Sequence, residues 1–293
     1  MHFADRLADA LDRTGAPACV GLDPVLEKIP QESLDATAGD GGDDIEALGD
    51  FCIGVLHAVR DAGITVVKPQ SACFERHGSA GMAQLERVIT EAHRLSLLIV
   101  LDAKRGDIGV SAEHYAAWAF DNLDVHAITV SPYLGPDTIE PFMREGRGVF
   151  ALVRTSNPES DAVQSPRLVD GRSVAEMIAD TVQELGRHRR GGRGMSDIGA
   201  VVGATKATEA AALRERMPDQ FFLVPGFGAQ GGTVEDVRGM TRPGRSGRSA
   251  GDLGVLVNAS RSVIYAKPQA GEKWTFAVRA AAEKLIADLR DLT

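Results

Sequence analysis

The chain has 293 residues, of which 44% are hydrophobic and 25% charged, and a formal net charge of −9. This composition is typical of a globular protein and excludes collagen-like and disordered classes. No apolar run approaches the roughly 18 residues that a transmembrane helix needs, and the first residues lack the apolar stretch of a signal peptide. The acidic balance argues against broad nucleic-acid binding, and three cysteines without a CxxC pair suit a reducing compartment. We therefore expect a cytoplasmic protein with neither a membrane nor a nucleic-acid partner.

Eight short apolar segments alternate with helical segments along the chain, after an amphipathic helix in the first 15 residues. The segments that predict strands are Ala18–Leu22, Ile64–Val67, Leu97–Leu101, Ala127–Val130, Val149–Val153, Ile198–Val202, Phe221–Val224 and Gly254–Val257. The predicted helices are Ile45–Ala62, Gly81–Leu95, Ser111–Asn122, Gly135–Arg144, Ser173–His188, Thr208–Arg216, Thr233–Gly239 and Glu272–Leu292. Continuous apolar runs are typical of strands buried on both faces, and strict alternation implies βαβ units. Eight units predict an α/β fold of the (β/α)8, or TIM, barrel type, with residues 1–293 forming one domain.

Three segments read as surface insertions in this barrel. Residues 31–44 are acidic, whereas residues 186–197 and 241–252 are rich in glycine and arginine. We expect the two basic segments to be solvated loops without an assigned role. An RNA-binding tract is the alternative for the two basic segments.

Charged residues follow several of the predicted strands, at the end of a barrel where catalytic residues lie. Asp23 follows the first strand and Lys68 the second, and the third continues into LDAKRGDIG with Asp102 and Lys104. Residues two apart on a strand share a face, so Asp102 is expected to hold Lys104 charged. Asp107 lies past a glycine and can point toward a neighbouring subunit. A catalytic cluster is the interpretation that we favour, and a structural ion pair at the barrel mouth is the alternative.

The segments after the seventh and eighth strands predict a phosphate site. Gly226, Gly228 and Gly231 follow the seventh strand, and Arg261 follows the eighth. Glycine-exposed N–H groups at a helix start favour a phosphate, and these two loops form the usual phosphate site of a barrel. The same glycines match a dinucleotide fingerprint, but that motif belongs in the first βα turn. A tight turn without a ligand is the remaining alternative.

These residues resemble the orotidine 5′-monophosphate decarboxylase family, in particular bacterial members with LDAKRGDIG and TVSPYLG-like segments. The resemblance extends from Gly21-Leu22-Asp23 to Arg261-Ser262, and the D-x-K-x-x-D core with its upstream lysine is the most diagnostic part. It implies decarboxylation of orotidine 5′-monophosphate (OMP) to uridine 5′-monophosphate (UMP) and CO2, without cofactor or metal. This reaction is the last step of de novo pyrimidine nucleotide biosynthesis. The resemblance also implies a homodimer with shared active sites.

The resemblance further implies a role for each matching residue. Lys104 would protonate C6 of the substrate, and Asp102 would lie beside the C6 carboxylate. Asp23 and Lys68 would hold the ribose hydroxyls, with Lys68 also part of the charged array, and Asp107 would enter the partner's site. The other matching positions, which would line that shared site, contact the pyrimidine or grip the phosphate, are Ile108, Ser111, Ser156, Pro225, Gln230 and Arg261. A departure is Ser260, where a glycine is common.

Two other functions remain open. Magnesium-dependent phosphosugar decarboxylases and hexulose-phosphate synthases share the D-x-K-x-x-D core, but they carry a glutamate metal ligand where this chain has Lys68, and an ammonium opposes Mg²⁺. A non-catalytic nucleotide-binding barrel is the other alternative, since a fold does not determine function. His77 and Tyr133 lie at the expected catalytic end, with roles that the sequence does not define.

Overall fold

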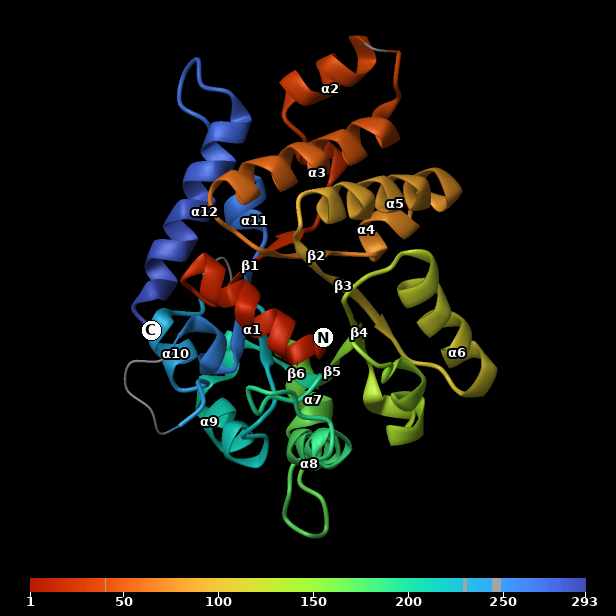
Figure 1. The fold of residues 1–293 in the computed structure, drawn as a ribbon, viewed down its shortest axis with the longest axis vertical. Coiled ribbons are helices and arrows are strands. Elements are labelled where there is room, and N and C mark those ends of the chain that lie inside the picture. Colours follow the sequence, from red (N-terminus) through yellow and green to blue (C-terminus); the bar gives the residue numbers. More distant parts are fainter. Residues whose placement is uncertain (40, 229–230, 244–248) are drawn as a thin grey trace.

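The computed structural model describes residues 1–39, 41–228, 231–243 and 249–293. Eight parallel strands form a closed barrel in which each strand pairs with its sequence neighbours and β8 pairs with β1 (Figure 1). The strands are β1 (Ala18–Leu22), β2 (Val66–Pro69), β3 (Leu98–Arg105), β4 (Ala127–Val130), β5 (Gly148–Arg154), β6 (Ile198–Val202), β7 (Phe222–Val224) and β8 (Val255–Ala259). The predicted (β/α)8 barrel is therefore confirmed, with every strand at its predicted place.

Helices surround the barrel, and three of the described helices begin with capping boxes. The capping pairs are Asp43 and Glu46 for α3, Ser173 and Glu176 for α8, and Thr233 and Asp236 for α10. The helices are α1 (Phe3–Thr14), α2 (Gln31–Gly39), α3 (Asp44–Asp61), α4 (Ala72–Glu75), α5 (Gly78–Arg94), α6 (Gly109–Ala117), α7 (Asp161–Gln164), α8 (Val174–Gly186), α9 (Ala207–Arg216), α10 (Val234–Arg238), α11 (Arg261–Ile264) and α12 (Trp274–Arg290). A π-helical turn, Trp118–Asn122, continues α6. Among the described residues, no helix has the length and apolar character needed to cross a membrane.

The connection after β4 differs from the prediction. A helix was expected over Gly135–Arg144, but the chain forms short 3-10 turns there, including Pro136–Thr138 and Glu140–Phe142. Each of these turns has a proline in its first two positions. A second proline within the segment removes a backbone donor that a continuous helix would need, which explains why the apolar spacing failed as a signal.

The acidic insertion at 31–44 is largely helical. Most of it forms α2, which packs against α3 (Figure 1). The Thr37 hydroxyl bonds to the Asp50 carboxylate of α3 at 3.0 Å. The segment therefore has one face that α3 covers.

One arginine of the basic insertion at 186–197 is used within the fold. Arg193 donates to Asp12 at 2.7 Å and to Asp9 at 3.1 Å, and both carboxylates belong to α1. It also donates to Asp252, at the end of the insertion at 241–252, at 2.9 Å. These ion pairs tie both insertions to α1, and they supply the structural role that the sequence did not reveal.

The barrel interior changes from apolar to polar along the strands. At the N-terminal end, α1 packs on inward-facing side chains, and the rings of Phe3 and Phe150 meet edge to face with centroids 6.2 Å apart. Inward residues recur every second position along a strand. Counting two positions on from the apolar inward residues Val66, Val100, Ala127 and Leu256 gives Lys68, Asp102, Thr129 and Asn258. This polar layer forms the floor of the site described below.

Candidate active site

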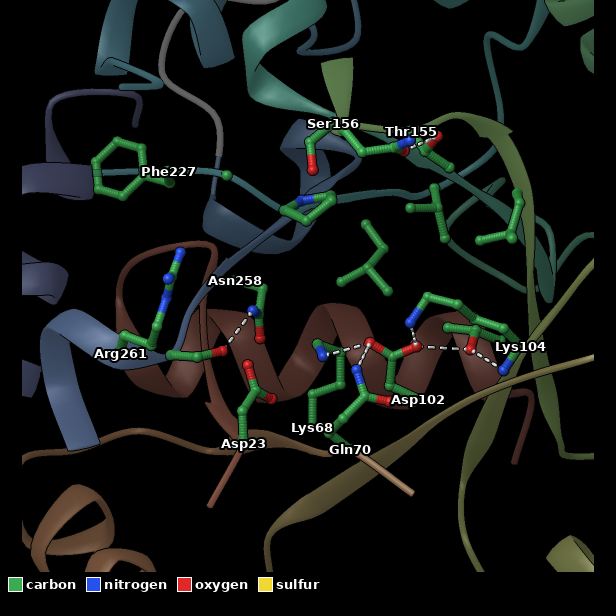
Figure 2. A pocket seen from close by; sticks show the side chains of 18 of the residues that line it. Asp23, Lys68, Gln70, Asp102, Lys104, Thr155, Ser156, Phe227, Asn258 and Arg261 are labelled. Carbon is green, nitrogen blue, oxygen red and sulfur yellow. Dashed lines mark hydrogen bonds and ion pairs between the residues drawn. The ribbon is translucent and has the colours of Figure 1, made fainter. Parts of the chain in front are cut away.

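A cavity of about 440 Å³ opens at the C-terminal end of the barrel (Figure 2). Its lining comes from the ends of nearly all the strands. The residues singled out from the sequence that line it are Asp23, Lys68, Asp102, Lys104, Ser156, Pro225 and Arg261. Most of the residues expected at the strand ends therefore lie around one cavity.

The Asp102 carboxylate lies between two lysines (Figure 2). Its Oδ2 is 2.6 Å from Lys68 Nζ, and its Oδ1 is 2.6 Å from Lys104 Nζ. The Gln70 side-chain amide also donates to Oδ2, at 3.3 Å. The Lys68 side chain is only 5% exposed, whereas that of Lys104 is 46% exposed. Lys68 is thus a buried counter-ion, and Lys104 is the cation that a ligand in the cavity can reach.

Both members of the buried pair remain charged at neutral pH. Burial alone would raise the pKa of Asp102, but the charges and hydrogen bonds of Lys68 and Lys104 hold this pKa well below its ordinary value. Burial alone would lower the pKa of Lys68, yet the nearby Asp102 and Asp23 carboxylates raise it above its ordinary value. The cavity therefore presents charges fixed before any ligand arrives, which is the arrangement that stabilises a transition state without reorganisation.

The backbone bends at Lys104, contrary to the regular strand expected. The pairing register of β3 and β4 shifts after Leu101, and Lys104 has a φ of 47°, which is uncommon outside glycine. Thr129 Oγ1 accepts from the N–H groups of Ala103 (3.1 Å) and Lys104 (2.9 Å). The same hydroxyl donates to Asp102 Oδ1 at 2.9 Å. Strained backbone of this kind persists only where its surroundings fix it, and here the threonine of β4 does so.

The opposite side of the cavity carries the loops expected to bind phosphate. Arg261 begins α11, and Pro225 and Gly226 follow β7. Gly226 and Gly228 have φ values of 91° and 67°, a region that favours glycine. The structure thus places the arginine and the glycine loop at one cavity. Gln230, the other residue expected there, lies outside the described residues.

Three of the expected residues lie elsewhere in this chain. Asp107, Ile108 and Ser111 are not among the described residues lining the cavity, and Ile108 is 61% exposed. Within the described part of the chain, the Asp107 carboxylate accepts a local bond, from the Ile108 N–H at 2.8 Å. His77 precedes α5 and Tyr133 is 83% exposed, and neither lines the cavity.

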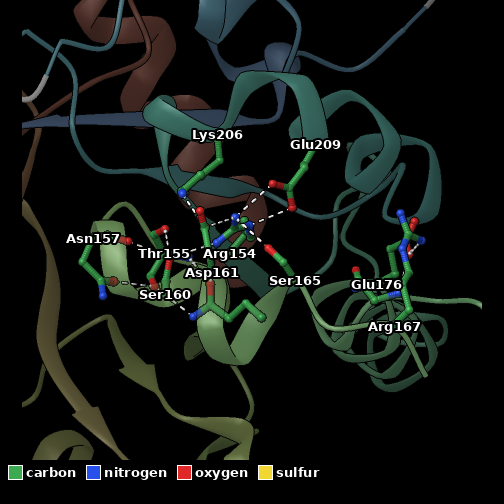
Figure 3. A network of polar contacts seen from close by, with 12 residues as sticks. Arg154, Thr155, Asn157, Ser160, Asp161, Ser165, Arg167, Glu176, Lys206 and Glu209 are labelled. Atoms are coloured by element: carbon green, nitrogen blue, oxygen red, sulfur yellow. Dashed lines mark hydrogen bonds and ion pairs between the residues drawn. The ribbon is translucent and has the colours of Figure 1, made fainter.

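Sequence reasoning missed the arginine that organises the loop after β5 (Figure 3). Arg154 is 1% exposed and donates to both carboxylate oxygens of Glu209, at 2.8 and 2.9 Å. It also donates to the Ser160 hydroxyl at 2.9 Å and pairs with Asp161. These contacts fix the loop that carries Ser156. An arginine closing an apolar strand was the only signal in the sequence.

Tyr265 was also missed, and it holds the loop after β1. Its hydroxyl accepts from the Val25 N–H at 2.7 Å and donates to the Asp23 carbonyl at 3.1 Å. Its ring stacks on Phe51, with centroids 5.8 Å apart and planes 7° apart. Because Tyr265 directly follows α11, it links the helix that begins with Arg261 to the loop of Asp23.

Comparison with known proteins supports the same family. The model of the orotidine 5′-phosphate decarboxylase / HUMPS family matches residues 17–274. The chain is 39% identical over 315 residues to orotidine 5′-phosphate decarboxylase of Rhodopirellula baltica, covering 99% of each chain. It is also 39% identical over 269 residues to the protein of that name from Cupriavidus necator, covering 91% of this chain and 90% of the relative.

Solved structures agree with the sequence relatives. The structure of Leishmania donovani OMP decarboxylase is similar with a TM-score of 0.76 and 32% identity, covering 99% of both chains. The structure of a putative orotidine 5′-phosphate decarboxylase from Streptomyces avermitilis is similar with a TM-score of 0.79 and 33% identity, covering 99% of this chain and 95% of the other. Site geometry, family model and relatives lead to one conclusion: the chain belongs to the orotidine 5′-phosphate decarboxylase / HUMPS family.

Proposed function

We propose that this protein converts OMP to UMP and CO2, the last step of de novo pyrimidine nucleotide biosynthesis, without a cofactor. The observation that carries the proposal is the Lys68–Asp102–Lys104 array, in which one carboxylate lies 2.6 Å from two ammonium groups at the floor of the cavity. The relatives named orotidine 5′-phosphate decarboxylase, which align over nearly the whole chain, support it.

The reaction uses Lys104 as its proton donor. With the substrate phosphate at Arg261 and the C6 carboxylate toward the Asp102–Lys104 pair, the bond between C6 and the carboxylate carbon breaks. CO2 leaves, and the electron pair remains on C6. The Lys104 ammonium stabilises this developing negative charge and then transfers a proton to C6, and the neutral amine regains a proton from solvent. Asp102 keeps the ammonium directed at the reacting carbon.

The remaining residues bind and orient the nucleotide. Asp23 Oδ1 is buried and has no hydrogen-bond partner in the described part of the chain, so a ribose hydroxyl can supply one. Lys68 lies beside it and holds Asp102 in place. Ser156 lines the cavity near the expected pyrimidine, and Pro225 belongs to the loop near the phosphate. Binding energy from the phosphate, remote from C6, would stabilise the transition state through this loop.

The ion pair of Lys68 argues against the magnesium-dependent alternative. A divalent cation needs several oxygen ligands, and Lys68 Nζ already occupies the open side of the Asp102 carboxylate at 2.6 Å. Among the described residues, no group of three or more His, Cys, Asp or Glu side chains lies in a metal-binding arrangement. Lys68 would oppose a cation placed at this strand end, so the geometry favours the charge-array reaction.

We also propose that two copies form a dimer with shared active sites. Asp107 lies near exposed apolar side chains of the segments that follow β3 and β4. These side chains are Ile108, Val110, Tyr133 and Leu134, each more than half exposed. The two segments begin side by side, because the Ser131 N–H donates to the Arg105 carbonyl at 2.7 Å. Exposed apolar patches of this kind mark interfaces, and a two-fold dimer would place Asp107 of each copy near the other's cavity.

A direct ultraviolet assay with OMP tests the activity. We expect conversion to UMP that is unchanged by EDTA, and near-complete loss of kcat in Lys104→Ala. Lys284→Ala is a matched control because that lysine is paired with Asp288 on the surface, 74% exposed. Substantial activity in Lys104→Ala, or no turnover by folded wild-type protein, would contradict the proposal, and inhibition by EDTA would favour the magnesium-dependent reaction.

Mixed dimers test the shared site. Lys104→Ala and Asp107→Ala are each expected to be inactive alone. After the two proteins are mixed and exchange subunits, half of the dimers carry one intact site, so about a quarter of the wild-type activity should return. No recovery, in a mixture shown by light scattering to contain dimers, would mean that each site is built from one chain.

A further inference from the structure

Asn258 is a buried polar side chain in β8 with an unfulfilled hydrogen bond. It is 7% exposed, and its Nδ2 donates to the Ser260 hydroxyl at 3.1 Å. Its Oδ1 is buried and has no hydrogen-bond partner among the residues that the structure describes. A buried acceptor without a donor costs folding free energy, and most such groups in native proteins are satisfied. The missing donor is therefore expected from something that enters the cavity.

The side chain lies in the middle of the cavity floor, between its two charged ends (Figure 2). Arg261 lies on one side of it and the Lys68–Asp102 pair on the other. Strand β1 runs alongside, with Cys19 in register with Asn258, and carries Asp23 at its end. Two residues that line the cavity, one in β8 and one directly after β1, thus each have a side-chain oxygen without a donor among the described residues.

A glycine on β1 makes room for this arrangement. A Cβ on Gly21 would lie 3.0 Å from Asn258 Oδ1 and 2.0 Å from the Ser260 hydroxyl. Any larger residue would therefore collide with the Ser260 hydroxyl, which accepts the hydrogen bond of the Asn258 amide, and would crowd that amide. The glycine thus leaves room for the pair of side chains that holds Asn258 at the cavity floor.

The hydrogen-bond donors of the nucleotide limit the groups that Asn258 could bind. The choice of OMP as the ligand rests on the proposed function. OMP offers three hydrogen-bond donors: two ribose hydroxyls and the pyrimidine N3–H. N3 lies across the ring from C6, so its hydrogen points away from the Asp102–Lys104 pair when C6 faces that pair. The ribose, which joins the phosphate to the base, lies between the two ends of the cavity, where Asn258 is.

We propose that Asn258 Oδ1 accepts a hydrogen bond from a ribose hydroxyl and that, with Asp23, it forms the ribose-recognition site. An amide does not titrate in the working range, so this acceptor is present at every pH. It also adds no negative charge beside the Asp23 carboxylate, where a second carboxylate would repel the first.

Calorimetric binding of UMP and of its 2′-deoxy and 3′-deoxy analogues tests the assignment. We expect Asn258→Ala to weaken UMP binding about 3- to 10-fold, the usual effect of one neutral hydrogen bond. The same variant should leave the affinity of one deoxy analogue within about twofold of wild type, because that analogue lacks the hydroxyl concerned. Unchanged UMP binding, or an equal loss for all three nucleotides, would overturn the proposal.

Two further measurements separate this result from other causes. Asn157→Ala removes an amide from the cavity rim that already bonds to Thr155; it should affect the three nucleotides equally. If Asn258→Ala does not fold, Asn258→Ser serves in its place, with the same expected pattern. Wild-type turnover of OMP is measured separately. If the wild type turns over OMP but Asn258→Ala loses the same affinity for all three nucleotides, only the ribose assignment is overturned. If the effect of Asn258→Ala depends on the hydroxyl but the wild type does not turn over OMP, the decarboxylase proposal is overturned and the ribose assignment is supported.

Discussion

Replacing Asp102 by asparagine should expose the energetic cost of the buried lysine beneath the cavity. Lys68 Nζ is 2.6 Å from Asp102 and the side chain is 5% exposed, so the Asp102→Asn variant leaves an ammonium in the barrel interior without its main partner. Removing one partner of a buried ion pair costs about 3–5 kcal/mol. Asp23 still attracts Lys68, so we expect the lower end, about 3 kcal/mol, at neutral pH. This is a large part of the roughly 5–15 kcal/mol that stabilises a typical domain.

The pH dependence distinguishes this cause from a general packing defect. In the variant, burial should lower the pKa of Lys68 below its unfolded value, so the unfolded chain binds more protons and stability rises with pH. In the wild type the pKa of Lys68 is raised, and the stability from the pair is present below the unfolded pKa and lost as pH rises through the folded one. The difference between the two proteins should therefore shrink between pH 7 and pH 10.

Urea unfolding at fixed protein concentration measures this difference at both pH values. Asp121→Asn is a suitable control, because its carboxylate is 61% exposed and paired with Arg144 at the surface. That change should cost no more than about 1 kcal/mol. A loss below about 1 kcal/mol in Asp102→Asn, or an equal loss at pH 7 and pH 10, would refute the reasoning.

Three other substitutions test the positioning of the site. Thr129→Val removes the hydroxyl that fixes the bend at Lys104. We expect kcat to fall about 10-fold or more and the free energy of unfolding to fall by about 1–3 kcal/mol. An unchanged kcat in the ultraviolet assay would contradict the positioning role of Thr129. Tyr265→Phe keeps the ring stack but frees the Asp23 loop, so kcat/KM for OMP should fall about 3- to 10-fold with little change in the melting temperature, and an equal kcat/KM would argue against it. Arg154→Met leaves the carboxylates of Glu209 and Asp161 without their shared cation, and we expect KM for OMP to rise. If Arg154→Lys restores KM, the charge alone, and not the forked geometry of the guanidinium, holds the loop that carries Ser156.

The strands were predictable because each is covered on both faces, which makes continuous apolar runs a strong signal. The helix expected over Gly135–Arg144 shows the limit of that reasoning, since apolar spacing there conflicts with prolines that remove backbone donors. Segment 31–44 shows another limit, because its acidic composition predicted a surface segment but gave no sign of the face that packs on α3. Composition describes the solvent side of such a segment and says little about the covered side.

Some residues of the site could be predicted from the sequence, and others could not. Lys68 and Asp102 were predictable because charged residues that end buried strands need partners. Thr129 and Asn258 carried a usable signal, since each lies two positions after an inward apolar residue. The role of Arg154 was not predictable, because its partner Glu209 is 55 residues away in the sequence. The positions assigned to a neighbouring subunit remain predictions, because they depend on a second copy of the chain.

The balance of charge in the cavity suits the proposed reaction. Among the described residues of one chain, the charged side chains that line the cavity are Lys68, Lys104, Arg261, Asp23 and Asp102, which is one more positive than negative charge. In the proposed reaction these cations attract the anionic nucleotide, while its carboxylate lies near Asp102 and is repelled by it. That repulsion disappears when CO2 leaves, whereas the attraction of Lys104 increases as negative charge develops on C6. The same ion pair thus favours the transition state over the bound substrate, which is the condition for raising kcat. Asp102 can play this part only while it stays ionised in the barrel interior, and the buried charge of Lys68 keeps it so.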